Sequence, residues 1–151
     1  MSNQGSNAIS IVQRIEWDAM HRIPGHEGIC KAYHGHRYAA EFTLTAEKLD
    51  TLGRVVDFYT VEEVLGGWIK RNFDHTALLY KNDDEPSVKA VIEMNARLGR
   101  PAYLLDGHPT VEVIVAELAR VSAELLNPHG VRIVSIRLWE TPESSAVWTA
   151  R

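Results

Sequence analysis

The strongest constraint on the fold is a pair of segments that alternate apolar and polar residues with a period of two. One face of the first segment collects Ile9, Ile11, Ile15, Trp17 and Ala19, and His21 continues it. After a loop at 22–33 that contains Pro and Gly, one face of the second collects His34, His36, Tyr38, Ala40, Phe42 and Leu44. Successive side chains of a strand point to opposite faces, so both segments are expected to form long, half-buried strands.

The middle of the chain shows helical spacing instead. A helix is expected from near Thr60, its N-cap, and its inner face would hold Val61, Val64, Leu65, Trp68 and Ile69. Two glycines in this run, at 66 and 67, weaken the helix by about 1 kcal/mol each. After a polar loop at 81–87, Ser87 is a candidate cap for a short helix with Val88, Val91, Ile92 and Leu98 on one side, closed by Gly99 and Pro101.

The C-terminal third predicts one more helix and two strands. Thr110 follows a proline and opens a helix whose inner stripe is Ile114, Leu118, Val121 and Leu125, ended by the segment 127–130. Alternation then returns, with Val134, Ile136 and Leu138 on one face, and a short strand is expected at 146–149. The order β-β-α-(α)-α-β-β predicts an α+β domain, an antiparallel four-stranded sheet with helices on one face.

Size and charge exclude several classes of protein. A chain of 151 residues suits one domain, which we place at 9–151 after a polar tail at 1–8 that is expected to be disordered. A net charge of −4 gives no basic surface for nucleic acid. No apolar run approaches the roughly 20 residues of a membrane span, and the N-terminus lacks the pattern of a secretory signal. The single cysteine agrees with a reducing, cytoplasmic location.

Three histidines have the spacing of a metal site. His34 and His36 project from the same face of one predicted strand, and His21 lies at the end of the other, so a hairpin would bring the imidazoles together. Three neutral imidazoles suit Zn²⁺ with a fourth position open for a substrate oxygen, although imidazole also binds iron, copper and nickel. The alternative is that they are ordinary polar groups at a strand end. His26, in the intervening loop, is a rival ligand.

Candidate acid–base groups surround these histidines in the sequence. Cys30 lies in the loop before His34, where a nearby cation would lower the pKa of its thiol. Asp74 and His75 are adjacent, and an aspartate that bonds a histidine makes it a proton donor or acceptor near neutral pH, although surface Asp-His pairs are common. Glu140 continues an inward face, where a planar heterocycle with parallel N–H groups could bind its carboxylate; otherwise it points to solvent.

Six motifs in the same order resemble the 6-pyruvoyl-tetrahydropterin synthase superfamily, and in particular its bacterial 6-carboxy-5,6,7,8-tetrahydropterin synthase branch. They are Trp-Asp-Ala-Met-His-Arg at 17–22, Cys-Lys-Ala-Tyr-His-Gly-His at 30–36, Val-Val-Asp-Phe at 55–58, Phe-Asp-His at 73–75, Pro-Thr-Val-Glu at 109–112 and Glu-Thr-Pro at 140–142. The short gap between Cys30 and the His-Gly-His motif is similar to that branch rather than to the pyruvoyl enzymes of animals.

The resemblance implies a tunnelling fold that assembles into homohexamers, dimers of trimers with active sites between subunits. It implies zinc on the three histidines, conversion of 7,8-dihydroneopterin triphosphate to 6-carboxytetrahydropterin, acetaldehyde and triphosphate, and a place in queuosine synthesis. The zinc would bind the side-chain oxygens and acidify the adjacent C–H. By the same resemblance, Cys30 moves the side-chain proton, His75 and Asp74 manage the opposite transfer, and Glu140 anchors the pterin beside Glu112 and Thr110.

Two features depart from the family pattern. Met20 stands where alanine is more usual, and the stretch between His75 and Thr110 is longer than in compact members, which predicts an insertion at about 81–107 with an added helix. Two other functions stay open on the sequence. One is a 6-pyruvoyl-tetrahydropterin synthase or related side-chain lyase, and the other is a zinc- or pterin-binding module without turnover.

Overall fold

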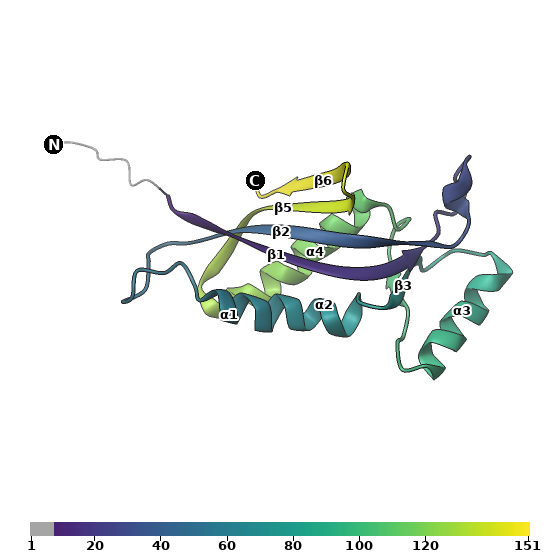
Figure 1. Ribbon diagram of the computed structural model, residues 1–151, viewed down its shortest axis with the longest axis horizontal. Coiled ribbons are helices and arrows are strands. Elements are labelled where there is room, and N and C mark those ends of the chain that lie inside the picture. Colours follow the sequence, from purple (N-terminus) through teal and green to yellow (C-terminus); the bar gives the residue numbers. More distant parts are fainter. Residues whose placement is uncertain (1–7) are drawn as a thin grey trace.

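The computed structural model describes residues 8–151, and its long axis follows two paired strands, β1 (Ser10–His21) and β2 (His34–Ala46) (Figure 1). They pair antiparallel from Ser10 opposite Thr45 to His21 opposite His34, which confirms the hairpin that the alternation predicts. Most of the predicted tail, residues 1–7, lies outside the described residues, and Ala8 is exposed.

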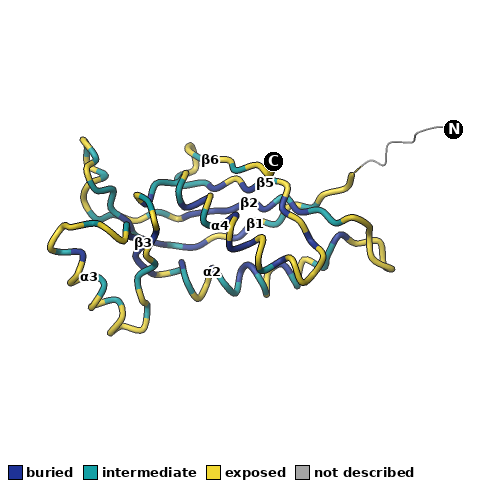
Figure 2. The backbone as a smooth tube through the Cα atoms, turned by 180° about the vertical axis from the view of Figure 1, so that it is seen from behind, coloured by how far each residue is buried: buried dark blue, intermediate teal, exposed yellow. Residues whose placement is uncertain are grey.

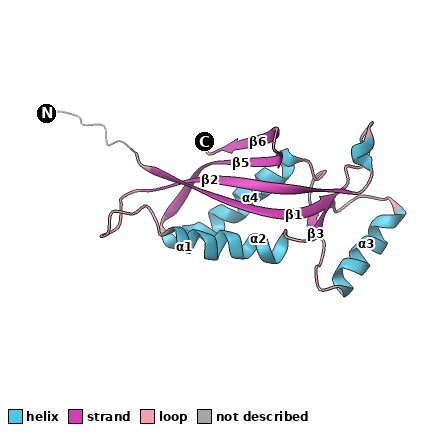
Figure 3. Ribbon diagram, viewed as in Figure 1, coloured by secondary structure: helices cyan, strands magenta, loops and turns pink. Residues whose placement is uncertain are grey.

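The sheet has six strands, in the order β4-β3-β1-β2-β5-β6 (Figure 3). The α+β class is therefore confirmed, whereas the prediction of four antiparallel strands is wrong. The two additional strands are β3 (Thr76–Tyr80) and β4 (Tyr103–Leu105). β3 pairs parallel with β1, and β4 pairs parallel with β3. The sequence pattern did not predict β3, because this strand is buried on both faces and its residues form a continuous apolar run without alternation.

Helices lie on both faces of the sheet rather than on one. The main core lies between one face and three helices: α1 (Phe58–Val61), α2 (Gly67–Asn72) and α4 (Val111–Leu126) (Figures 1 and 2). The helix α3 (Pro86–Arg97) packs instead against Ala77 and Leu79 of β3, whose neighbour Leu78 points into the main core. Alternation along a strand places these residues on opposite faces, so α3 covers the other face.

Helix starts follow the capping rules, although two caps differ from the predicted ones. α1 begins three residues early, because the Asp57 carboxylate accepts the Tyr59 N–H at 2.8 Å and replaces Thr60 as the cap. α3 is capped by Glu85, with Pro86 in the first turn, rather than by Ser87. The predicted cap of α4 at Thr110 is confirmed, with its Oγ1 accepting the Val113 N–H at 3.4 Å.

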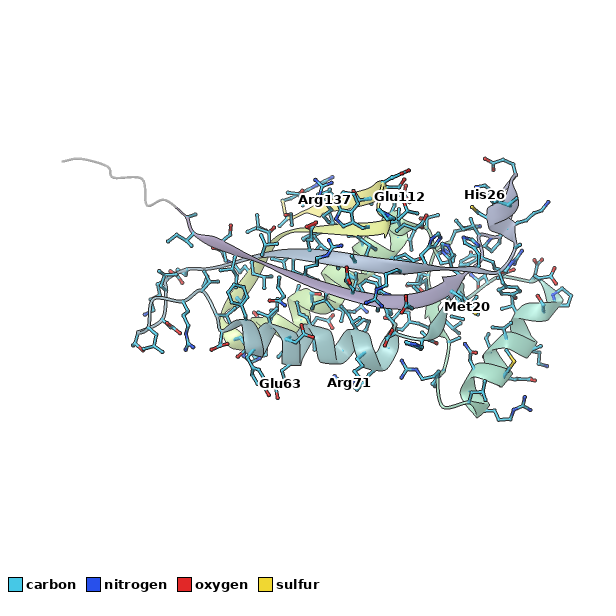
Figure 4. All side chains as sticks on the ribbon, in the orientation of Figure 1. Met20, His26, Glu63, Arg71, Glu112 and Arg137 are labelled. Carbon is cyan, nitrogen blue, oxygen red and sulfur yellow. The ribbon has the colours of Figure 1, made fainter. Side chains whose placement is uncertain are left out.

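Gly66 and Gly67, which were expected to weaken the helix, lie where α1 and α2 join. A π-helical turn, η2 (Glu62–Gly66), links these helices into one continuous rod. A Cβ at Gly66 would lie 2.6 Å from Oε1 of Glu62, so a larger residue there would displace that side chain. Glu63 and Arg71 point from this rod away from the sheet (Figure 4).

The C-terminal strands are β5 (Val131–Thr141) and β6 (Ser144–Thr149), reached from α4 through the short turn η3 (Asn127–His129). A β-bulge in β5 leaves Val134 without a partner residue on β2: Thr43 pairs with Ser135, whereas Leu44 pairs with Ile133. The bulge changes the phase of the alternation, so Ile133 and Ile136 are buried while Val134 is 38% exposed. The predicted inward position of Val134 is therefore wrong.

Candidate metal centre

The three histidines that the sequence singles out lie together where β1 and β2 end. His21 pairs directly with His34, and His36 pairs with Ala19, so all three rings leave the same face of the hairpin. Their ring centroids are 4.5 to 5.1 Å apart, and one ring nitrogen of each lies within 4.8 Å of the others. The Nε2 atoms of His21 and His34 are 3.0 Å apart.

Backbone carbonyls orient two of these rings. Nδ1 of His21 donates to the carbonyl oxygen of Pro109 at 2.7 Å, just before α4, and Nδ1 of His34 donates to that of Ala32 at 2.8 Å. Because a carbonyl only accepts, these bonds place the proton on Nδ1 and leave each Nε2 with a free lone pair. This is the arrangement in which outer hydrogen bonds fix metal-binding imidazoles. Pro109 belongs to the Pro-Thr-Val-Glu motif at 109–112, but no sequence pattern indicated that its backbone carbonyl contacts His21.

The third imidazole supports a metal more directly. Nε2 of His36 is buried and has no hydrogen-bond partner among residues 8–151. Its nearest acid is Glu140, whose Oε1 lies 3.9 Å away, beyond hydrogen-bond distance. A buried polar atom without a partner costs about 1–3 kcal/mol, and a coordinated cation would remove that cost. The residues present therefore fit a metal ion bound by nitrogen.

Burial favours the neutral form of His21 and His36. Desolvation lowers the pKa of His21 to about 4, and the neighbouring His34 and His36 act in the same direction against the Pro109 carbonyl. Burial also lowers the pKa of His36, opposed by the charge of Glu140. Metals bind neutral imidazole, so burial favours the form of these two rings that can bind a cation.

Glu140 occupies the end of β5, beside the histidines. Its side chain is 24% exposed and borders a groove of about 500 Å³ together with His36, Arg37 and Trp139. Burial and the nearby Glu140 charge raise the pKa of Tyr38, which keeps that phenol protonated. Tyr38, absent from the sequence-based site, is fully buried, and its hydroxyl lies 3.3 Å from Nδ1 of His21.

The side chains of Asp74 and His75 contact each other, which their adjacency in the sequence alone did not establish. Oδ1 of Asp74 lies 2.9 Å from Nδ1 of His75 and also accepts the Asp18 N–H at 3.1 Å. Although burial acts to raise it, the pKa of Asp74 is lowered by these two donors. His75 has a φ of 57°, and its backbone N–H donates to the carbonyl of Asp18 at 2.7 Å. This backbone bond holds the residue in a conformation that non-glycine residues rarely adopt.

His75 is turned outward and shares a groove with His36. Its side chain is 71% exposed, and the groove, of about 530 Å³, is also bordered by Met20 and Asn95. Arg100, which follows α3, donates to the Asp74 carbonyl and to that of Lys70. The pair is thus anchored through its backbone while the imidazole of His75 is free to contact a ligand.

The remaining predicted site residues lie outside the three-histidine cluster. Cys30 lies in the short 3-10 turn η1 (Ile29–Lys31), is half-buried, and is not part of the three-histidine cluster. His26, the rival ligand, is in the same loop and accepts the Gly28 N–H through Nδ1 at 2.8 Å; Figure 4 places it in the loop beyond the end of β1. Thr110 uses its hydroxyl to cap α4, and Glu112 is exposed on the first turn of that helix.

Comparison with known proteins agrees with this geometry. The family model described as 6-pyruvoyl tetrahydropterin synthase matches residues 10–151. The chain belongs to this family. Proteins named 6-carboxy-5,6,7,8-tetrahydropterin synthase from Rickettsia bellii and Rickettsia felis are 38% and 36% identical to it over 135 residues, which cover 89% of this chain and 95% of each relative.

Two solved structures superimpose on most of the chain. An uncharacterized protein of Wolinella succinogenes has a TM-score of 0.81 at 19% identity, covering 97% of this chain and 100% of its own. The 6-pyruvoyl tetrahydropterin synthase of Caenorhabditis elegans has a TM-score of 0.67 at 16% identity, covering 95% and 96%. At this identity the likeness concerns the fold.

Among residues 8–151, no helix is long and apolar enough to cross a membrane.

Proposed function

We propose that this chain is a zinc-dependent 6-carboxy-5,6,7,8-tetrahydropterin synthase. It would convert 7,8-dihydroneopterin triphosphate to 6-carboxy-5,6,7,8-tetrahydropterin, acetaldehyde and triphosphate. The observation that carries the proposal is the cluster of His21, His34 and His36, with a buried, unpartnered Nε2 on His36 and Glu140 beside it. Relatives at 34–38% identity that bear this name support the choice of reaction.

The three histidines hold the ion, and Zn²⁺ is our choice because three neutral imidazoles are typical of catalytic zinc. When bound, the metal supplies Lewis acidity toward the side-chain oxygens of the substrate. Glu140 binds the pterin: its carboxylate accepts two parallel hydrogen bonds from the ring N–H and the adjacent amino group. Its position 3.9 Å from His36 supports binding of the ring next to the metal ligands.

Proton transfer is assigned to the thiol and to the Asp74–His75 pair. Cys30 accepts the proton from the substrate side chain. Nδ1 of His75 is held by Asp74 at 2.9 Å, which leaves Nε2 to exchange a proton with the substrate on the other side. Glu112 and Thr110, at the start of α4 next to the Pro109 carbonyl that orients His21, border the substrate pocket.

Assembly completes this site in our proposal. The 71% exposure of His75 and the open edges of the sheet at β4 and β6 suit a homohexamer, a dimer of trimers, in which each active site draws on two subunits. Mixing inactive Cys30→Ala and His75→Ala subunits would then restore part of the activity. The predicted cytoplasmic location and a place in queuosine synthesis stay predictions.

The proposal is tested by incubation of the zinc-loaded protein with 7,8-dihydroneopterin triphosphate, followed by mass analysis. Release of acetaldehyde with 6-carboxytetrahydropterin is the expected result, whereas a product that keeps its three-carbon side chain would identify a 6-pyruvoyl-type enzyme. Cys30→Ala should abolish turnover with full zinc content, and His26→Ala, in the same loop, is the matched control. Absence of turnover in the parent protein would favour a binding module.

A further inference from the structure

A buried ion pair connects the 81–107 segment to the loop that carries Cys30. Asp83 lies between β3 and α3, and its side chain is 2% exposed. Its Oδ2 accepts a hydrogen bond from Nη1 of Arg22, the residue directly after β1. Its Oδ1 accepts the backbone N–H of Glu85, the cap of α3, at 3.1 Å. One carboxylate thus holds Arg22 against the beginning of α3.

Arg22 extends this connection to the backbone beside the thiol. Its Nε donates to the carbonyl oxygen of Lys31 at 2.9 Å, and its guanidinium lies 5.9 Å from the centroid of the Tyr33 ring. The preceding carbonyl, that of Cys30 itself, accepts the N–H of Ile23 at 2.8 Å. Two consecutive carbonyls, at Cys30 and Lys31, are therefore bound by the two residues that follow His21.

A second contact joins the other end of the loop to α3. The Tyr33 hydroxyl lies 3.0 Å from Oγ of Ser87, in the first turn of that helix. The Tyr33 ring also packs on the small core that Ala77, Leu79 and Val88 form on this face of the sheet. The loop is thereby attached at both of its ends, through Arg22 to Asp83 before α3 and through Tyr33 to α3 itself, and none of these contacts belongs to the three-histidine cluster.

We propose that Asp83 and Arg22 are positioning residues that set the location of the Cys30 thiol relative to the metal centre. A buried carboxylate is stable only when it is paired, and a guanidinium can bind the carboxylate through Nη1 and a carbonyl through Nε at the same time. A lysine ammonium lacks that planar fork. The inference rests on the proposed function only in making Cys30 the reacting group.

The test uses the fact that Cys30 is the only cysteine of the chain, so alkylation by iodoacetamide reports on this thiol alone. In the zinc-loaded protein without substrate, Asp83→Asn removes the charge while keeping the shape. It should increase the alkylation rate about threefold or more, because the loop opens more often. Asp106→Asn is the matched control: Asp106 is in the same segment, is 91% exposed and pairs with Lys81 at 2.7 Å.

Turnover gives the second readout. Asp83→Asn should lower kcat by about ten- to a hundredfold with KM within about twofold, because misplacing a reacting group costs rate rather than affinity. Arg22→Lys keeps the ion pair but not the Nε bond to Lys31, so it should also show faster alkylation and a lower kcat. If Asp83→Asn does not fold, the results for Arg22→Lys decide whether the positioning role holds. Zinc content should match the parent in both variants.

The outcomes separate this inference from the proposed function. Alkylation and kcat equal to those of Asp106→Asn would overturn the positioning role, as would faster alkylation that appears only together with loss of zinc. A parent protein without turnover would contradict the proposed function, whereas the alkylation rates, measured without substrate, would still decide whether Asp83 and Arg22 hold the loop.

Discussion

Metal removal should destabilise this protein, and the effect should require each of the three histidines. A ligand present at 100 to 1,000 times its dissociation constant stabilises the folded state by about 2.7 to 4.1 kcal/mol. For a chain of 151 residues, each kcal/mol shifts Tm by about 2–4 °C. We therefore expect addition of a chelator to lower Tm by about 5–16 °C.

The structure indicates why the metal-free state is the weaker one. His21 is 1% exposed, and Nε2 of His36 is buried without a partner among the described residues. Without a cation, that nitrogen alone carries a desolvation cost of about 1–3 kcal/mol. The cost falls on the folded protein only, since water solvates the ring in the unfolded chain.

Differential scanning calorimetry with and without chelator measures this shift. His36→Ala should lose most of the difference between the two conditions, whatever its own Tm, because one of three ligands is gone. His26→Ala removes a histidine from the adjacent loop and should keep the full difference. A full response of His36→Ala to the chelator, or no response of His26→Ala, would contradict a metal site built by the three histidines.

Three further predictions address the pocket, an ion pair and the core. Glu140→Gln should raise KM by about ten- to a hundredfold, since an amide cannot accept both hydrogen bonds of the pterin, and steady-state kinetics will measure this. Arg120 lowers the pKa of Glu117, so that pair stabilises the fold at neutral pH, and the contribution is lost as pH falls through the lowered pKa. Urea unfolding should find Glu117→Gln less stable at pH 7 by no more than about 1 kcal/mol, because Arg120 is more than half exposed, and this difference should narrow in acid. Leu118→Ala, at a site 1% exposed, should cost about 2–5 kcal/mol in the same assay without altering zinc content.

Local patterns were sufficient to predict how several residues of the candidate site are arranged. The period-two alternation placed His21 on the same face as His34 and His36, and antiparallel pairing then brought the rings together. Alternation also predicted that Glu140 points inward, and at the end of β5 its carboxylate lies 3.9 Å from His36. These inferences succeeded because the direction of a side chain on a strand depends only on its position along the strand.

Other features of the site depend on contacts between distant parts of the chain, which local sequence patterns do not predict. The Pro109 carbonyl that orients His21, the contact between Arg22 and Asp83, and the anchor that Arg100 provides for Asp74 all join residues more than 25 positions apart. The bulge at Val134 reversed a local prediction, since an unpaired residue becomes visible only when two strands are aligned.

Sequence alone determined the α+β class, the long paired strands and the three candidate ligands, because each follows from local periodicity. Only the tertiary structure decided that the sheet has six strands, that α3 covers the opposite face, and that the 81–107 segment binds the Cys30 loop. Parallel pairing and buried ion pairs depend on which surfaces meet in space, and short-range spacing does not encode that.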